Sequence, residues 1–213
     1  MISRHVAVGV VVALAAAMSA CTGKTTDSPN PPTPGTSARP SSSAAAGLPF
    51  AGAPKVANPL SATVLSGDPC VDALTPEQVR PILGAPLKQS RDDLAAVGPA
   101  CTWANLDRGS QLNVGYATVA KTGLSGVYQN TKPQSGVWRP IADVQGFPAV
   151  AHAGSPGQTP KDLCVVTVGL ADEFAVDVAV VLGSAKQGVV DPCGIAADAA
   201  GTVTATLKAK AGA

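Results

Sequence analysis

Four cysteines spread over the C-terminal two thirds of the chain constrain its fold more than any other feature. Cys70, Cys101, Cys164 and Cys193 lie 31, 63 and 29 positions apart. Zinc sites generally contain CxxC-type pairs, and this spacing has none, so no metal site is expected. An even number of cysteines in an exported chain predicts two disulfides, with three pairings open. Evidence of export would therefore favour disulfides over a metal.

The N-terminus predicts export. Arg4 and His5 form a short basic start, and an unbroken apolar stretch follows from Val6 to Met18. As a helix these 13 residues would span about 20 Å at about 1.5 Å per residue, whereas the bilayer core is ~30 Å thick. The segment is therefore expected to be a secretory signal and not a membrane span.

The residues that end this signal resemble the bacterial lipobox. Met18, Ser19 and Ala20 lead directly into Cys21. In that motif a diacylglyceryl group is attached to the thiol and the signal is cut just before it. The resemblance implies a signal peptide over residues 1–20 and a lipid anchor at Cys21, with the protein held on the extracytoplasmic face of the cell membrane. An ordinary cleaved signal followed by an incidental cysteine is the alternative.

Two segments of different composition follow. Residues 22–66 contain 8 Pro and 13 Ser or Thr among 45 residues, without apolar periodicity. Such a segment cannot bury enough surface to offset its ordering entropy, so residues 21–66 are expected to be the lipidated cysteine and a disordered tether. A globular domain is expected over residues 67–213.

Composition limits the classes of partner. Without Arg4 the chain has 14 basic and 14 acidic side chains, a balance that excludes the clustered basic surplus of a nucleic-acid binder. Charged residues make up 14% of the chain and aromatic residues 3%. The core must therefore consist mainly of Val, Leu and Ala.

Local patterns predict an α+β domain. Thr75, Pro76 and Gln78 form a helix start with capping-box spacing, and Gly84 is placed to end that helix. Strands are expected over 101–104, 111–117, 137–141, 149–152, 162–170 and 173–182, with a short helix at 123–132 and a closing helix over 192–208. Helices at both ends with strands between predict a small antiparallel sheet covered by N- and C-terminal helices.

Two Asp-Pro-Cys triplets frame this domain. They contain Cys70 and Cys193, and each stands just before an expected helix. Each has a further cysteine on a nearby expected strand, Cys101 and Cys164 respectively. This arrangement favours the pairing Cys70–Cys101 and Cys164–Cys193 among the three.

The ordered set of motifs resembles a known family. The triplets, together with Leu74-Thr75-Pro76, Leu83-Gly84 and Cys101-x-Trp103, are similar to a family of actinobacterial lipoproteins of the mycobacterial type. That family is known only as domain of unknown function 3558. The likeness covers about Asp68 to Leu207. It implies a cell-envelope setting and a small α+β domain, and it implies no reaction.

Catalytic patterns are absent from the sequence. Beyond the signal His152 is the only histidine, and no GxSxG elbow, HExxH helix or phosphate-binding glycine loop accompanies it. His152 is interpreted as a surface residue at a strand end, and a His-independent enzyme would rely on carboxylates such as Asp143 or Asp177. Trp103 and Trp138 are core anchors or line a ligand groove.

These observations favour a protein that is not an enzyme and has no cofactor. It is expected to be a membrane-anchored binding or accessory module of the cell envelope, with an envelope protein as its partner. A carrier of lipid or another apolar ligand is the alternative, since a Val- and Leu-rich sheet under a helix can enclose an apolar cavity.

Overall fold

The computed structural model describes residues 47–212. The expected signal, the anchor Cys21 and residues 22–46 of the expected tether lie outside this range. The elements in chain order are η1 (Ala62–Leu65), α1 (Pro69–Asp72), α2 (Pro76–Leu83), β1 (Lys88–Arg91), β2 (Ala100–Asn105), β3 (Ser110–Ala117), α3 (Gly123–Gly126), η2 (Val127–Thr131), η3 (Lys132–Gln134), β4 (Val137–Val144), β5 (Phe147–Ala153), β6 (Leu163–Gly169), β7 (Ala175–Val181) and α4 (Pro192–Ala211).

The seven strands form one antiparallel sheet in the order β1-β2-β3-β7-β6-β5-β4. Val180 of β7 stands opposite Leu112 of β3 on one side and Cys164 of β6 on the other. Side chains two residues apart share a face, so these three residues and those that alternate with them lie on one face of the sheet. Nearly all are buried, including the expected run Phe174, Val176, Val178, Val180 and Leu182. The antiparallel sheet, the helices and two disulfides agree with the expected α+β class.

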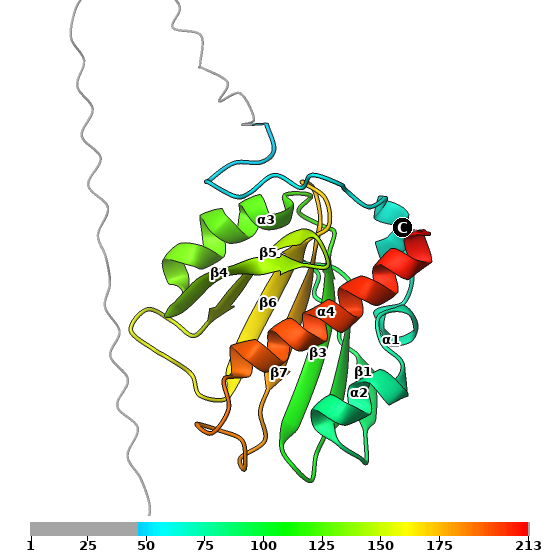
Figure 1. Ribbon diagram of the computed structural model, residues 1–213, viewed down its shortest axis with the longest axis vertical. Coiled ribbons are helices and arrows are strands. Elements are labelled where there is room, and N and C mark those ends of the chain that lie inside the picture. Colours follow the sequence, from blue (N-terminus) through cyan, green and yellow to red (C-terminus); the bar gives the residue numbers. More distant parts are fainter. Residues whose placement is uncertain (1–46, 213) are drawn as a thin grey trace, which may run out of the picture. The chain divides into compact units, whose positions relative to one another are not determined.

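Helix α4 packs against β6 and β7 on this apolar face and runs across the sheet in Figure 1. Asp191 caps it by accepting a 3.0 Å hydrogen bond from the backbone N–H of Cys193, and Pro192 occupies its first position. Its buried stripe includes Ala199, Val203 and Leu207. Burial of a Val or Leu side chain contributes about 1.5–3 kcal/mol, so this stripe holds the helix on the sheet.

Helix α2 has the expected ends. The Thr75 side chain and Gln78 form the capping box, and the Gln78 side chain accepts a 2.8 Å bond from the Thr75 N–H. Gly84 ends the helix with φ 81°, a conformation that favours glycine. Pro81 lies inside the helix and removes one backbone donor. As its presence predicts, the helix is short, at eight residues.

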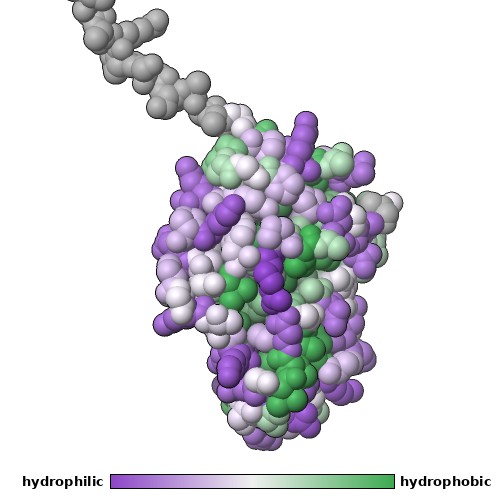
Figure 2. Space-filling model, turned by 60° about the vertical axis from the view of Figure 1, so that its left-hand side comes forward, coloured by the Kyte–Doolittle hydropathy of each residue, from purple (hydrophilic) through white to green (hydrophobic). Residues whose placement is uncertain are grey.

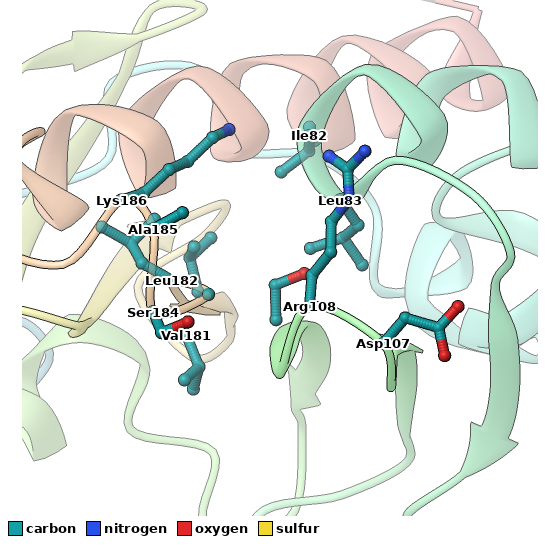
Figure 3. Close-up of a pocket in the computed structure, with 12 residues that line it drawn as sticks. Ile82, Leu83, Asp107, Arg108, Val181, Leu182, Ser184, Ala185 and Lys186 are labelled. Carbon is teal, nitrogen blue, oxygen red and sulfur yellow. The ribbon is translucent and has the colours of Figure 1, made fainter.

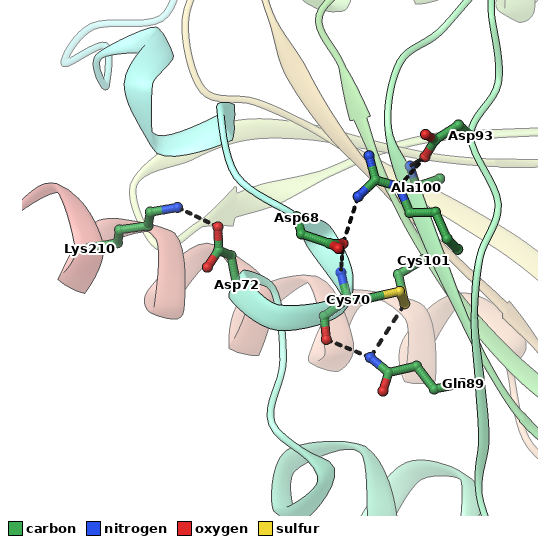
Figure 4. A network of polar contacts seen from close by, with 9 residues as sticks. Asp68, Cys70, Asp72, Gln89, Asp93, Ala100, Cys101 and Lys210 are labelled. Atoms are coloured by element: carbon green, nitrogen blue, oxygen red, sulfur yellow. Dashed lines mark hydrogen bonds and ion pairs between the residues drawn. A yellow bond between two sulfur atoms is a disulfide. The ribbon is translucent and has the colours of Figure 1, made fainter.

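The first Asp-Pro-Cys triplet is fixed to the sheet by polar contacts and a disulfide (Figure 4). Asp68 accepts a bond from the Cys70 N–H at 2.8 Å and forms an ion pair with Arg91 of β1, also at 2.8 Å. Cys70 is bonded to Cys101 of β2. The second disulfide joins Cys164 of β6 to Cys193 of α4. Both pairs match the favoured pairing.

The folded part begins earlier than expected. Residues 47–66, assigned to the tether from their Pro and Ser content, pack on the domain. Val56, Val64 and Leu65 are 3–4% exposed and belong to the core. The Leu60 N–H donates to the Leu170 carbonyl at 2.9 Å. The boundary near Gly67 is therefore wrong. The Pro, Ser and Thr content averaged over residues 22–66 conceals apolar residues in its last part, which follow no helix or strand period and still fill the core.

Two strand predictions also need correction. Strand β1 was missed because its four residues are all exposed and have no apolar alternation. The hairpin between β4 and β5 turns at Gln145-Gly146, with φ 54° and 87°, whereas the strands expected over 137–141 and 149–152 left a longer connection between them. Both strands are consequently longer than predicted, and Phe147 is a buried strand residue.

The face of the sheet opposite α4 is contacted by α3, which packs on β6. A Cβ on Gly169 would lie 2.8 Å from a methyl carbon of Leu124, so glycine permits this close approach. Among residues 47–212 no helix is long and apolar enough to cross a bilayer.

Candidate functional site

A cavity of about 280 Å³ opens at one end of the sheet, where three segments meet. They are the end of α2, the turn 106–109 between β2 and β3, and the loop after β7. Figure 3 shows side chains from all three around a common space. Small-molecule sites commonly enclose ~300–1,000 Å³, so this cavity, at about 280 Å³, is at the lower limit of their size.

One wall of the cavity is apolar, because it is formed at the ends of α2 and β7 by side chains that belong to the hydrophobic core. Leu83 is the last residue of α2 and Leu182 directly follows β7; they are 2% and 3% exposed. Ile82 and Val180 add to the same surface. An apolar group bound against these side chains would be removed from water.

A buried amide positions the turn that carries Arg108. Asn105, 0% exposed, donates from its side-chain nitrogen to the Leu83 carbonyl at 3.0 Å. Its side-chain oxygen accepts a 3.2 Å bond from the Arg108 N–H. The amide thus links the end of α2 to the turn, and both its donor and its acceptor are used.

Two glycines allow the three segments to come close. A Cβ on Gly84 would lie 2.9 Å from the Cζ of Arg108, so the guanidinium lies against the end of α2. A Cβ on Gly183 would lie 2.4 Å from the Arg108 carbonyl oxygen. Any larger residue at Gly183 would force the turn and the loop apart and open the cavity wall.

The rim of the cavity is basic. Arg108 and Lys186 are exposed, and neither has an ion-pair partner among residues 47–212. In Figure 3 both side chains stand at the top of the cavity, while the carboxylate of Asp107 points away from it. The lining also includes Ser110, whose buried hydroxyl has no partner within the described range. The cavity therefore combines an apolar wall with unpaired positive charge.

A second cavity, of about 410 Å³, adjoins the first and shares Ile82 and Lys186 with it. It lies between α2 and α4 and includes Pro81, Ile195 and Ala199 in its lining. Gln78, Asp198 and Thr202 also line it, so the surface that continues from the first cavity along α4 is partly apolar and partly polar.

A polar chain of three side chains lies on the opposite face of the sheet. The Thr167 hydroxyl donates to Asp177 Oδ1 at 2.6 Å. Thr167 has only one hydroxyl proton, so Nε2–H of His152 is the donor in the 3.0 Å contact with Thr167 Oγ1. Burial lowers the pKa of His152 to about 4, so its imidazole is neutral near pH 7. Burial raises the pKa of Asp177, and the Thr167 hydrogen bond partly offsets that rise.

The residues singled out from the sequence are separated by the fold. Trp103 is 2% exposed in the core on the α4 side, so its assignment to a ligand groove is wrong: the alternation of β2 turns it inward. Trp138 lies on the opposite face, 6.2 Å from the His152 ring and stacked on it. Asp143 is on β4, which β5 and β6 separate from the β7 strand that carries Asp177. His152 lies one residue from the end of β5, as expected, but it is partly buried and hydrogen-bonded and is not a free surface residue.

The cavity residues were not found from the sequence. The pattern Asp107-Arg108-Gly109-Ser110 indicates only a turn, and Lys186 lies in a loop without any motif. Arg108 and Lys186 are brought together by the pairing of β3 with β7, and Ile82 joins them because α2 packs on β2 and β3. Among the described residues, no group of three or more His, Cys, Asp or Glu side chains is placed to hold a metal ion.

Fold and cavity together define a disulfide-linked α+β domain with an antiparallel sheet and a basic-rimmed apolar cavity. The chain belongs to the family described as "Protein of unknown function (DUF3558)", whose model matches residues 16–206. The resemblance on the Asp-Pro-Cys triplets is thus confirmed at the level of the family. No curated protein and no solved structure matches the chain.

Proposed function

We propose that this chain is an exported lipoprotein, anchored through Cys21 on the extracytoplasmic face of the cell membrane, whose domain binds an amphiphilic anion without catalysis. The observation that carries the binding role is the pairing of an apolar wall with two unpaired cations in one cavity. Leu83 and Leu182 would contact the apolar part of the ligand, while Arg108 and Lys186 would face its phosphate or carboxylate. Arginine suits such anions because its planar donors form paired hydrogen bonds.

The arrangement on the opposite face supports a role without catalysis. Thr167, the hydroxyl nearest to His152, is 0% exposed and already donates to Asp177. A nucleophile must reach the substrate and transfer its proton to a base. Thr167 is enclosed, and Nε2 of His152 carries a proton in this contact and cannot accept another.

The adjoining cavity between α2 and α4 favours a second role, that of a carrier. Apolar surface around Ile195 and Ala199 would extend the contact with a longer acyl chain. A carrier of lipid would bind long-chain anions more tightly than short ones, whereas an accessory module that only senses a headgroup would not distinguish them. Affinity as a function of chain length separates the two roles.

Calorimetry of the chain from residue 22 onwards, with alkyl phosphates as ligands, tests the binding role. Dodecyl phosphate is expected to bind, and dodecanol, which lacks the anion, to bind more weakly. Arg108→Gln and Lys186→Gln should each reduce affinity for dodecyl phosphate at least tenfold, because hydrogen bonds to a charged group contribute about 1.5–3 kcal/mol. Lys121→Gln, at the other end of the sheet, is the matched control. Absence of dodecyl phosphate binding would refute the binding role.

Fractionation of cells tests the anchor separately. Cys21→Ala should move the protein from the detergent phase to the soluble fraction. The variant lacks the thiol that would carry lipid, and stable attachment requires two or more acyl chains. Retention of the variant in the membrane would contradict lipidation at Cys21 and leave the cavity result unaffected.

A further inference from the structure

The two ends of the sheet differ in charge. At the end with the cavity, the loops 84–88, 106–109, 154–162 and 183–191 contain four cations, Lys88, Arg108, Lys161 and Lys186, against Asp107, Asp162 and Asp191. Asp191 is paired with Arg139 at 3.1 Å. The loops at the other end, 92–99, 118–122, 145–146 and 170–174, contain four acids, Asp92, Asp93, Asp172 and Glu173, against Lys121. Of these acids Asp93 is paired with Arg91 of β1, and Lys208 of α4 donates to the Gln145 carbonyl at this end at 3.1 Å. We call these the basic end and the acidic end.

The basic end also presents apolar side chains to solvent. Leu106, in the turn between β2 and β3, is 67% exposed. Val189 and Val190, in the loop before α4, are 78% and 36% exposed. Figure 2 shows hydrophobic side chains gathered at this lower end of the molecule, next to hydrophilic ones. The acidic end also exposes apolar side chains, Leu94 at 52% and Val119 at 54%, so the two ends differ in charge and not in apolar exposure. Apolar loop tips beside unpaired cations are suited to an interface that is both apolar and anionic.

We propose that the basic end docks on the surface of a bilayer that contains anionic lipids. Lys161 and Lys186 would lie among the headgroups, with Leu106 and Val189 between them at the acyl boundary. The acidic end would be repelled by the same surface, so the charge distribution also orients the domain. Binding through a few cations and short apolar side chains is weak and reversible.

The cavity opens at the basic end, since Arg108 and Lys186 are part of its rim. Docking would therefore bring the cavity against the lipid surface and shorten the path of an amphiphile between bilayer and protein. The docking proposal does not depend on this, because a domain whose cavity binds nothing would still present the same loops.

The segment between Cys21 and the described domain is long enough for the basic end to face the bilayer. If Cys21 is anchored, residues 22–46 separate it from the described domain. Twenty-five residues reach at most about 80–90 Å at ~3.3–3.6 Å each, whereas the longest strands, of eight residues, span about 26 Å. The basic end can thus reach the bilayer without straining the chain.

Sedimentation with vesicles tests the proposal, using the chain from residue 22 onwards, which lacks the Cys21 thiol. We expect binding to vesicles of phosphatidylcholine mixed with phosphatidylglycerol, little binding to phosphatidylcholine alone, and weaker binding as salt increases. Lys161→Glu should lower the partition coefficient at least fivefold, since loss of one cation near the surface corresponds to about fivefold. Val189→Asp should lower it as well.

Matched controls come from residues away from the basic end. Val71 is 74% exposed, close to the value for Val189, so Val71→Asp adds the same charge at an equally exposed position. Lys121→Glu is the control for Lys161→Glu. Both control variants should bind vesicles like the unchanged chain. Equal losses for controls and basic-end variants, or no preference of the unchanged chain for anionic vesicles, would overturn the proposal.

Dodecyl phosphate separates this proposal from the cavity. Val189 and Lys161 do not line the cavity, so their variants should keep the affinity of the chain for that ligand. Loss of vesicle binding with retained ligand binding supports docking as a separate property. Vesicle binding that survives in both basic-end variants would refute docking, whatever the ligand result.

Discussion

The buried imidazole of His152 should make the domain less stable in mild acid. Burial lowers its pKa from 6.5 to about 4, so the unfolded chain binds a proton more readily than the folded domain between these values. Stability rises with pH wherever the unfolded state binds more protons. The contribution of neutral His152 is therefore fully present above pH 6.5 and is lost as the pH falls through that window. At pH 4.5 the loss amounts to about 2.5 kcal/mol, at about 1.36 kcal/mol per pKa unit.

Asp177 acts in the opposite direction. Its pKa is raised by burial, so the folded domain takes up a proton more readily than the unfolded chain and gains stability as the pH falls. The pH dependence of stability of the unchanged protein is therefore the difference between the opposing contributions of His152 and Asp177. Substitution of each residue separates them, because His152→Gln keeps a neutral amide in place of the ring and Asp177→Asn removes the titrating carboxyl.

Urea unfolding at pH 7 and pH 4.5, followed by circular dichroism, measures both effects. When the pH is lowered from 7 to 4.5, the free energy of unfolding should fall most for Asp177→Asn, less for the unchanged chain, and least for His152→Gln. The difference between the unchanged chain and His152→Gln should be about 2.5 kcal/mol. Equal pH dependence of these two chains would refute the reasoning, because it would mean that His152 titrates alike in both states.

Three further predictions concern stability and can be checked by urea unfolding at pH 7. Replacing both Cys164 and Cys193 by Ser should cost about 3.5 kcal/mol in the chain-entropy model, because the disulfide spans 29 positions. Leu207→Ala should cost about 2–5 kcal/mol, since this side chain is 0% exposed under the sheet. Asn105→Ala should cost about 1–3 kcal/mol by leaving a buried carbonyl without its donor, and should also weaken dodecyl phosphate binding.

The elements that could be predicted are those whose signal is local. The capping residues of α2, the alternation along β7 and the stripe of α4 depend on neighbours within one element, and the structure contains all three. Both disulfides follow from the same logic, since each joins a helix start to a strand already visible in the sequence.

The candidate site was not predictable because its signal is not local. Arg108 and Lys186 are 78 positions apart and come together only because β3 pairs with β7. Strand β1 was missed for a related reason: it is an edge strand with polar, fully exposed side chains, and only its pairing with β2 makes it a strand. The apolar side chains of residues 47–66 follow no helix or strand period, yet Val56 fills a core position, and its N–H donates to Oδ1 of Asp172 at 2.9 Å.

The two disulfides are matched in loop length but differ in what they hold. Cys70–Cys101 fixes α1 to β2, whereas Cys164–Cys193 fixes the first turn of α4 to β6. The second bond therefore restrains the end of the loop 183–191, whose other end continues from β7. That loop carries Lys186 and Val189, so its position decides both the cavity rim and the basic end. Loss of either disulfide should cost a similar stability, about 3.5 kcal/mol. Only the loss of Cys164–Cys193 should also weaken ligand and vesicle binding under conditions in which both variants remain folded.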